Sequence, residues 1–260
     1  MQTKIPKIIH CCWFGGNPMP PLLLQCMQSW KVFCPDWTVM LWNEETFNVE
    51  SHPFTSSAYR AKKYAFVSDY VRAWALFNQG GVYLDTDVEL KHSLNEFCHH
   101  DGFSGFESVG IPFTALWGSI PQHNLAKHVL DYYHDKTYQH GAEPPNTGWI
   151  SKLIAEKYQI DIWCDQHQSG SDGFNTFDVY PSSHFCLDLP MNYASHHFYG
   201  SWLPDKTASF KDAVHVNYYQ QQMTKNKKIS KDSLKSLAAI ITWQQIFDLI
   251  RWRLKSILKK

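Results

Sequence analysis

Two acidic side chains interrupt an apolar segment of the sequence, GGVYLDTDVEL at residues 80–90. The apolar residues predict a strand over residues 82–90, in which successive side chains point to opposite faces. Asp85 and Asp87 then share one face, near the carboxyl end of the strand, where open α/β sheets bind ligands. Two carboxylates this close repel each other unless a cation lies between them, and a divalent cation that prefers oxygen is the usual solution. The spacing therefore indicates a metal site, although the same triplet also fits a strand end in water.

A long helix is predicted immediately before this strand, over residues 57–79, and it ends at Gly80-Gly81. One face of the helix carries residues at helical spacing, namely Ala65, Ser68, Asp69, Arg72 and Leu76. The opposite face is expected to pack in the core and consists of Phe66, Val67, Tyr70, Val71, Trp74 and Phe77. Asp69 and Arg72 also fit an ordinary ion pair on a helix surface. Because the helix leads directly into the strand, we expect its polar stripe and the two acids to line one crevice.

The elements that must position these residues alternate along the chain. Strands are predicted at residues 7–13 and 37–42, with a helix at 22–33 between them. Together with the long helix and the acidic strand, this order predicts an α/β domain built on a parallel sheet. The later part of the chain predicts helices at 123–135 and 148–158 and a short strand at 177–181.

The composition supports a folded protein and excludes some partners. The chain has 260 residues, of which 44% are hydrophobic and 15% aromatic, which is enough for a packed core. The formal net charge is zero, so no global field favours nucleic acid as a partner. Seven cysteines without metal-binding spacing are typical of reduced thiols in a cytosol. No signal peptide and no membrane span of about 18 apolar residues is predicted, so we expect a cytoplasmic protein.

The charge is distributed unevenly between the body and the last residues. Residues 225–260 contain ten Lys or Arg and two Asp, a net charge of +8. Apolar residues recur there at helical spacing, and Trp243 and Trp252 are among them. We therefore predict two parts, a domain at 1–222 and a basic amphipathic helical segment at 223–260 that associates with an anionic membrane surface, the inner face of the cell membrane. The alternative is a terminal helix packed on the domain, with its lysines in water.

The segment AFVSDYVRAWALFNQGGVYLDTDVE, residues 65–89, resembles the DXD sugar-binding region of the family 32 glycosyltransferases. The same arrangement is similar to that of the clostridial glucosylating toxins. IPKIIHCCWFGGNPMP at residues 5–20 and HHFYGSW at 196–202 resemble the family's first strand and its closing motif. The resemblance implies a GT-A type, Rossmann-like domain with a mostly parallel sheet. It also implies metal-dependent transfer of a hexose from a UDP- or GDP-sugar to a saccharide acceptor, which includes lipid-linked acceptors.

The resemblance also implies a role for each residue that matches the donor-binding motifs. Trp13 would stack on or flank the nucleotide base. Ser68, Asp69 and Arg72 match the family's SD-x-x-R motif, whose acid and arginine hold sugar hydroxyls and ribose. Asp85 would contact ribose and sugar, and the expected catalytic residues are Asp85, Arg72 and the second acid of the motif, Asp87.

The metal-binding roles carry one ambiguity. Asp87 would ligate Mn²⁺ or Mg²⁺ bridging the diphosphate. His196 or its neighbour His197 would help to hold the metal or the leaving group, and the motif alone does not choose between them. Ser201 and Trp202 would close over the diphosphate. We expect retention of the anomeric configuration, and a place in bacterial capsule, O-antigen or lipopolysaccharide biosynthesis.

The sequence also allows two alternative functions, and it differs from the family pattern in one segment. Asp85 and Asp87 also fit the loop of haloacid-dehalogenase-like phosphatases, in which Asp85 would be the nucleophile. A non-catalytic nucleotide-sugar-binding scaffold at a membrane is the other alternative. Residues 146–149 read Asn-Thr-Gly-Trp where family members often carry Gly-Pro, so no catalytic role is assigned there.

Overall fold

The computed structural model describes residues 2–190, 192–200, 214–216, 218–220 and 246. It divides into two units, Met1–Val216 and Asn217–Lys260. The segment 223–260, predicted to be an amphipathic helix on a membrane surface, lies outside the described residues apart from Ile246. That segment and the boundary at residue 222 therefore remain predictions, and the fold and the site belong to the first unit. No helix among the described residues is both long and apolar enough to span a membrane.

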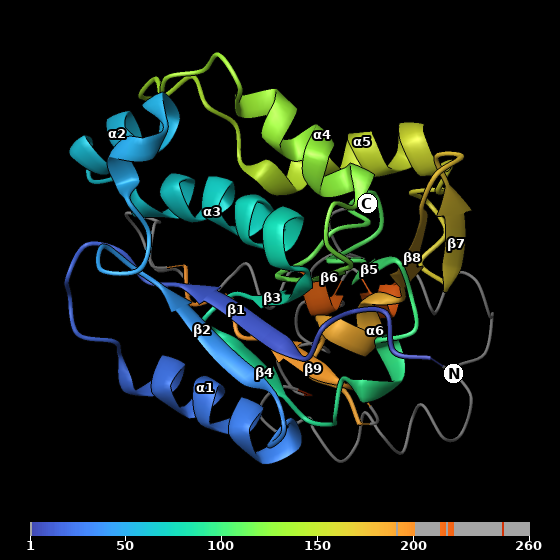
Figure 1. The fold of residues 1–260 in the computed structure, drawn as a ribbon. Helices are drawn as coiled ribbons and strands as arrows, with labels where there is room; N and C mark the ends of the chain where they lie inside the picture. The colour runs from blue at the N-terminus through green and yellow to red at the C-terminus, as the bar shows by residue number, and fades with distance from the viewer. Residues whose placement is uncertain (1, 191, 201–213, 217, 221–245, 247–260) are drawn as a thin grey trace, which may run out of the picture. The chain divides into compact units, whose positions relative to one another are not determined.

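A mixed seven-stranded sheet forms the centre of the first unit (Figure 1). Its strands, in spatial order, are β2 (Thr38–Trp42), β1 (Ile8–Cys12), β3 (Gly81–Leu84), β6 (Leu116–Ser119), β5 (Gly102–Gly105), β8 (Thr176–Tyr180) and β7 (Gln168–Ser171). The pairs β1–β2, β1–β3 and β5–β8 are parallel, whereas β3–β6, β5–β6 and β7–β8 are antiparallel. The expectation of a mostly parallel sheet was wrong, because β6 lies between β3 and β5 and is antiparallel to both, and β7 is antiparallel to β8.

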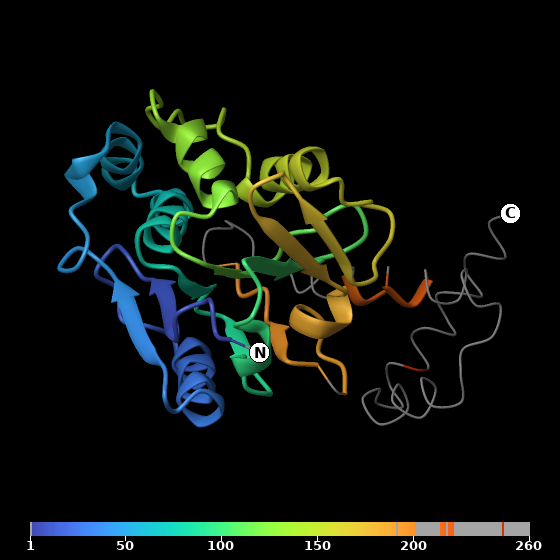
Figure 2. The same cartoon turned by 45° about the vertical axis from the view of Figure 1, so that its right-hand side comes forward.

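Helices cover both faces of this sheet (Figures 1 and 2). They are α1 (Pro21–Phe33), α2 (Pro53–Arg60), α3 (Tyr64–Gln79), α4 (Asn124–Tyr133), α5 (Asn146–Tyr158) and α6 (Ser182–Phe185), with short 3₁₀ turns at Val49–Ser51 and Asn95–Phe97. One core lies between the sheet and α3, α4 and α5, and includes Val67, Leu125 and Ile150. A second core lies on the other face, against α1, α6 and a two-stranded ribbon of β4 (Val88–Leu90) and β9 (Ala194–His196). The fold therefore belongs to the α/β class, as expected.

The predicted helix over residues 57–79 is two helices in the structure. α2 ends at Arg60 and α3 begins at Tyr64, because Lys62 adopts a left-handed conformation with φ of 57° between them. Gly80, with φ of 64°, ends α3 as predicted, and its N–H donates to the Leu76 carbonyl. The interruption changes the direction of the chain before α3, so α2 and α3 are separate helices and the polar residues 68–72 belong to α3 alone.

The predicted strand over residues 82–90 is also interrupted. β3 ends at Leu84, the Asp85 N–H donates to Ala115 O at 2.9 Å, and the Val88 N–H donates to Asp85 O at 3.0 Å. This turn carries the chain out of the central sheet and into the separate ribbon as β4. Asp85 and Asp87 therefore lie in a turn, and the argument from alternating strand faces does not apply to them.

Candidate metal and donor site

The turn between β3 and β4 places Asp87 against the far end of the described chain. In the ribbon, Val88 pairs with His196, and the His197 N–H donates to Asp87 O at 3.0 Å. Asp87 Oδ2 accepts the Tyr199 N–H at 2.8 Å and lies 3.4 Å from His196 Nε2. The two side chains are largely enclosed, with exposed fractions of 13% for Asp87 and 11% for His196. A carboxylate and an imidazole are thus fixed together by a backbone pairing.

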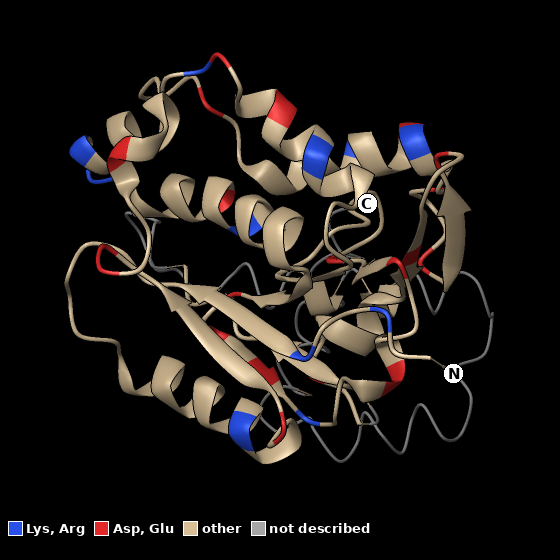
Figure 3. Ribbon diagram, in the orientation of Figure 1, with Lys and Arg blue, Asp and Glu red and all other residues tan. Residues whose placement is uncertain are grey.

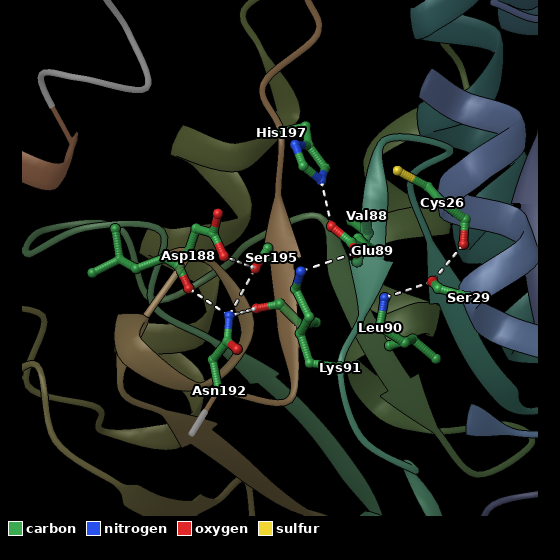
Figure 4. Close-up of polar contacts among 12 residues, drawn as sticks. Cys26, Ser29, Val88, Glu89, Leu90, Lys91, Asp188, Asn192, Ser195 and His197 are labelled. Carbon is green, nitrogen blue, oxygen red and sulfur yellow. Dashed lines mark hydrogen bonds and ion pairs between the residues drawn. The ribbon is translucent and has the colours of Figure 1, made fainter. Parts of the chain in front are cut away.

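The structure separates the two adjacent histidines. His197 Nε2 lies 2.9 Å from Glu89 Oε2, and Figure 4 shows this pair beside the ribbon, with Lys91 nearby. The Lys91 ammonium lies 2.9 Å from the other oxygen of Glu89. His196, in contrast, faces Asp87. The structure therefore distinguishes the two histidines by position: His196 lies beside the acids, whereas His197 is paired with Glu89.

One buried amide ties down the loop that leads into β9. Asn192 Nδ2 donates to Leu187 O at 2.7 Å, to Ala194 O at 3.0 Å and to Ser195 Oγ at 2.8 Å. Ser195 Oγ in turn donates to Asp188 Oδ1 at 3.1 Å. Figure 4 shows Asp188, Asn192 and Ser195 gathered on the β9 side of the ribbon. These bonds help to hold β9, and therefore His196, in its pairing with β4.

Asp85, Asp87 and His196 form a group that suits a divalent cation. Each offers one ligand atom, and these atoms all lie within 4.8 Å of one another. Two carboxylates and one imidazole are ligands that Mn²⁺ accepts, whereas an all-oxygen set would suit Mg²⁺ better. The residues therefore fit the metal that the sequence predicts, with Asp85 added to the predicted ligands and His196 preferred to His197.

The Asp87–His196 pair is electrostatically coupled. Burial alone would raise the pKa of Asp87, but the charge of His196 and the Tyr199 N–H outweigh it, so the pKa is lowered. Burial would lower the pKa of His196, but Asp87 outweighs it and holds that pKa well above the ordinary value of 6.5. The protonated His196 thus supplies the positive charge that pairs with the Asp87 carboxylate. A cation bound by His196 would have to displace that proton.

Arg72 connects the polar residues of α3 to the turn. Asp69 and Arg72 are the only charged residues of α3, and Figure 3 shows its red and blue segments close together. Arg72 Nη2 lies 3.0 Å from Asp69 Oδ1 and 3.2 Å from Asp85 Oδ1. The guanidinium also lies 4.5 Å from the centre of the Tyr83 ring, whose hydroxyl donates to Asp85 at 2.9 Å. Of the residues predicted to line one crevice, Asp69, Arg72 and Asp85 are therefore connected in one chain of charged side chains.

These residues are more buried than the helical pattern predicts. Asp69 and Arg72 are each 7% exposed, whereas Phe66 and Trp74 on the expected core face are only half-buried. Burial raises the pKa of Asp69 to about 7, against the opposing charge of Arg72. Arg72 Nε is buried and has no hydrogen-bond partner among the described residues. A buried donor without a partner is costly, so this N–H suits an oxygen of a bound ligand.

Two residues join the site although no role was predicted for them. Asn146, at the start of α5, is buried, and its Nδ2 donates to Asp69 Oδ1 at 2.7 Å. Tyr83 holds Asp85 through its hydroxyl. Asn146 Oδ1 also accepts the Thr147 hydroxyl at 3.3 Å, and an amide with two N–H donors beside a charged pair is a candidate sugar ligand. The only sequence signal for it was an Asn-Thr pair that follows two prolines.

The remaining predicted residues are less closely connected to this group. The Trp13 N–H donates to Trp42 O at 2.9 Å, at the end of β2, and its indole N–H donates to Asn17 O at 2.6 Å, in the loop that follows β1. Ser68 Oγ donates to Tyr64 O at 3.2 Å within α3. Ser201 and Trp202 lie outside the described residues. The predicted roles of these four residues stay predictions.

Comparison with known proteins bears on the same residues. Residues 20–104 match the family model described as the glycosyltransferase sugar-binding region containing a DXD motif, which confirms the resemblance for this part of the chain. Over 103 residues the chain is 32% identical to inositol phosphoceramide mannosyltransferase 3 of Schizosaccharomyces pombe, a match that covers 38% of this chain and 29% of that protein. Over 130 residues it is 28% identical to mannosyl phosphorylinositol ceramide synthase CSH1 of Saccharomyces cerevisiae, covering 48% and 34%.

The chain thus spans about a third of the length of these curated relatives. Among solved structures, PaToxG Glycosyltransferase aligns with a TM-score of 0.45 and 14% identity, over 58% of this chain and 68% of that one.

Proposed function

We propose that this protein is a metal-dependent glycosyltransferase that uses a nucleoside-diphosphate hexose. The observation that carries the proposal is that ligand atoms of Asp85, Asp87 and His196 lie within 4.8 Å of one another. The two acids lie inside the segment that matches a DXD sugar-binding region, and the strand that carries His196 pairs with that segment. A divalent cation bound there would neutralise the diphosphate leaving group as its negative charge develops.

The protein's own residues then orient the donor. Arg72 cannot lose its charge, and its unpartnered Nε–H can donate to a donor oxygen while Nη2 stays on Asp69 and Asp85. Asp69 and Asn146 present a carboxylate and an amide that can recognise sugar hydroxyls. Tyr83 keeps the Asp85 carboxylate turned toward the site. The arrangement thus assigns metal ligation to Asp85, Asp87 and His196, and sugar recognition to Asp69 and Arg72 of α3 with Asn146 of α5.

Finer features of the proposal rest on different support. Mannose is the proposed hexose, because the relatives in both yeasts are named as mannosyl-transferring proteins. A GT-A type fold, retention at the anomeric carbon and a saccharide acceptor in a bacterial capsule, O-antigen or lipopolysaccharide pathway are supported by the sequence resemblance alone. Peripheral binding to the inner face of the cell membrane is supported by the charge of +8 in residues 225–260.

The test is a screen of GDP-mannose and other UDP- and GDP-hexoses with purified full-length protein. We expect release of the nucleoside diphosphate from at least one donor with Mn²⁺ and none with a chelator. In the same series, p-nitrophenyl phosphate should not be hydrolysed, since that activity would indicate the phosphatase alternative. Absence of turnover with every donor, under conditions where the protein binds Mn²⁺, would refute the proposed enzyme and leave the binding scaffold.

A further inference from the structure

Glu107 is an acidic residue that lies at the same edge of the sheet as Asp85. β3 and β5 run in the same direction because each is antiparallel to β6. Their registers place Leu84 level with Leu116, and Ser104 level with Trp117. Asp85 follows β3 directly and Glu107 lies two residues beyond the end of β5. With β6 between them, the two positions are about 10 Å apart along the sheet edge, since neighbouring strands are about 4.8 Å apart.

The backbone of Glu107 is held in place on both sides. Its N–H donates to Ile111 O at 2.9 Å, which closes a tight turn, and the preceding Phe106 N–H donates to Tyr180 O at 2.8 Å. The Cys186 thiol donates to Glu107 O at 3.6 Å, and the His196 N–H donates to Cys186 O at 2.9 Å. Cys186 therefore joins Glu107 directly to the strand that carries His196.

The side chain of Glu107 has no polar partner among the residues that the structure describes. Within the described part of the chain, its carboxylate makes no hydrogen bond and no ion pair, although the residue is not exposed. Burial raises its pKa to about 7; His196 acts against this shift, whereas the charges of Asp85 and Asp87 add to it. The carboxylate thus lies within electrostatic range of all three residues of the metal group. A half-buried carboxylate without a hydrogen bond or ion pair to a protein group lowers the stability of the fold. This cost favours a function in which the carboxylate interacts with a bound ligand.

Glu107 is not part of the ligand group itself. Among the described residues, the atoms within 4.8 Å of one another belong to Asp85, Asp87 and His196. Glu107 and Asp85 instead both follow the carboxyl ends of their strands, with Ala115 at the start of β6 between them, and α/β sheets bind ligands beyond these strand ends.

We propose that Glu107 is a catalytic residue whose carboxylate faces the anomeric centre of the bound donor and stabilises the positive charge that develops there. This inference rests on the proposed transferase function. The acceptor oxygen forms a bond to the anomeric carbon, and the bond from that carbon to the diphosphate oxygen breaks with its electrons leaving on the diphosphate. The acceptor's proton passes to the departing diphosphate. Glu107 exchanges neither atoms nor electrons, and acts by its negative charge in an enclosed site.

The test compares Glu107→Gln with Asp87→Asn and with Glu156→Gln, an exposed control on α5, all as full-length protein. For Glu107→Gln we expect kcat for GDP-mannose turnover to fall about 100-fold or more, as for other electrostatic groups. Its affinity for Mn²⁺ and for GDP should stay within about threefold of wild type, because the carboxylate is expected to act on the transition state and not on the bound metal or nucleotide. Glu156→Gln should match wild type, and Asp87→Asn should lose Mn²⁺ affinity.

A second variant excludes a merely structural effect. Glu107→Ala should regain part of its lost rate when formate is added, because the small anion can occupy the position of the carboxylate. Glu107→Gln with activity within about threefold of wild type would overturn the inference, as would a loss of Mn²⁺ affinity equal to that of Asp87→Asn. Failure of formate to restore any activity would count against it as well. A wild-type protein that turns over no donor refutes the proposed function, whereas an active wild type matched by Glu107→Gln refutes only this inference.

Discussion

Asp87→Asn is the substitution that tests the metal site most directly, and the structure changes what it should do. From the sequence, Asp87 is a strand-end acid whose loss should leave the fold intact. In the structure its carboxylate is 13% exposed and is paired with His196, which is 11% exposed. Removing one partner of a buried pair costs about 3–5 kcal/mol. Because His196 can release its proton and both groups keep some contact with water, we expect about 2–3 kcal/mol without metal.

The pH dependence of this loss follows from the two pKa shifts. The lowered pKa of Asp87 contributes stability above its ordinary value of 3.8, and this is lost as pH falls through the lowered value. The raised pKa of His196 contributes stability that is fully present below 6.5 and is lost as pH rises through the raised value. The deficit of Asp87→Asn should therefore be largest near pH 5–6, between these limits, and should shrink at alkaline pH.

Thermal unfolding with and without Mn²⁺ measures both effects. A deficit of 2–3 kcal/mol corresponds to a fall in Tm of roughly 4–12 °C for a domain of about 200 residues. Mn²⁺ at about 100 times its Kd should stabilise wild type by about 2.7 kcal/mol and leave Asp87→Asn unchanged. Glu89→Gln is the matched control on the same ribbon: its partners are more exposed, so it should lose less than about 1 kcal/mol and keep the Mn²⁺ shift. A full Mn²⁺ shift in Asp87→Asn would refute the site.

Three further outcomes are expected. Arg72→Lys should lower donor turnover at least about 10-fold, because an ammonium cannot contact Asp69 and Asp85 as a planar fork while also donating to a ligand. Asp178→Asn should cost about 1–3 kcal/mol in urea unfolding at pH 6. Burial opposes the lowered pKa of Asp178, but His100 and His167 outweigh it, so that loss should disappear as pH falls below 3.8 through the lowered value. Deleting residues 225–260 should abolish sedimentation with phosphatidylserine vesicles; if wild type ignores such vesicles, the membrane proposal is wrong.

Local patterns in the sequence were enough to predict most of the elements that position the site. β1, α1, β2 and α4 lie within a few residues of their predicted ranges, because turn residues and apolar periodicity are encoded within each segment. The Gly80 end of α3 was predictable for the same reason. The mixed sheet was not, since the antiparallel insertion of β6 beside β3 depends on a pairing between segments about thirty positions apart.

The depth at which the polar stripe of α3 is buried has a physical cause. The alternative of an ordinary ion pair on a helix surface does not hold, because Asp69 and Arg72 are both buried. Burial is possible because Asn146, 77 positions away, donates to Asp69 and because the β3–β4 turn presents Asp85 to Arg72. Neither partner is visible within the helix. A charged pair on a helix that precedes an acidic turn is therefore better treated as a buried network whose partners are still to be found.

The choice between His196 and His197 shows most clearly why position in a motif was insufficient. Adjacent residues in a strand face opposite ways, so the register of β9 against β4 decides which histidine meets Asp87. A slip of one residue would bring His197 to the acids and would also break the pairing of His197 with Glu89. Asn192, with its three hydrogen bonds to the loop and to β9, resists that slip. The metal group is thus determined by a two-stranded ribbon and a buried amide that carry no recognisable motif, and substitutions there should affect Mn²⁺ binding without touching a ligand.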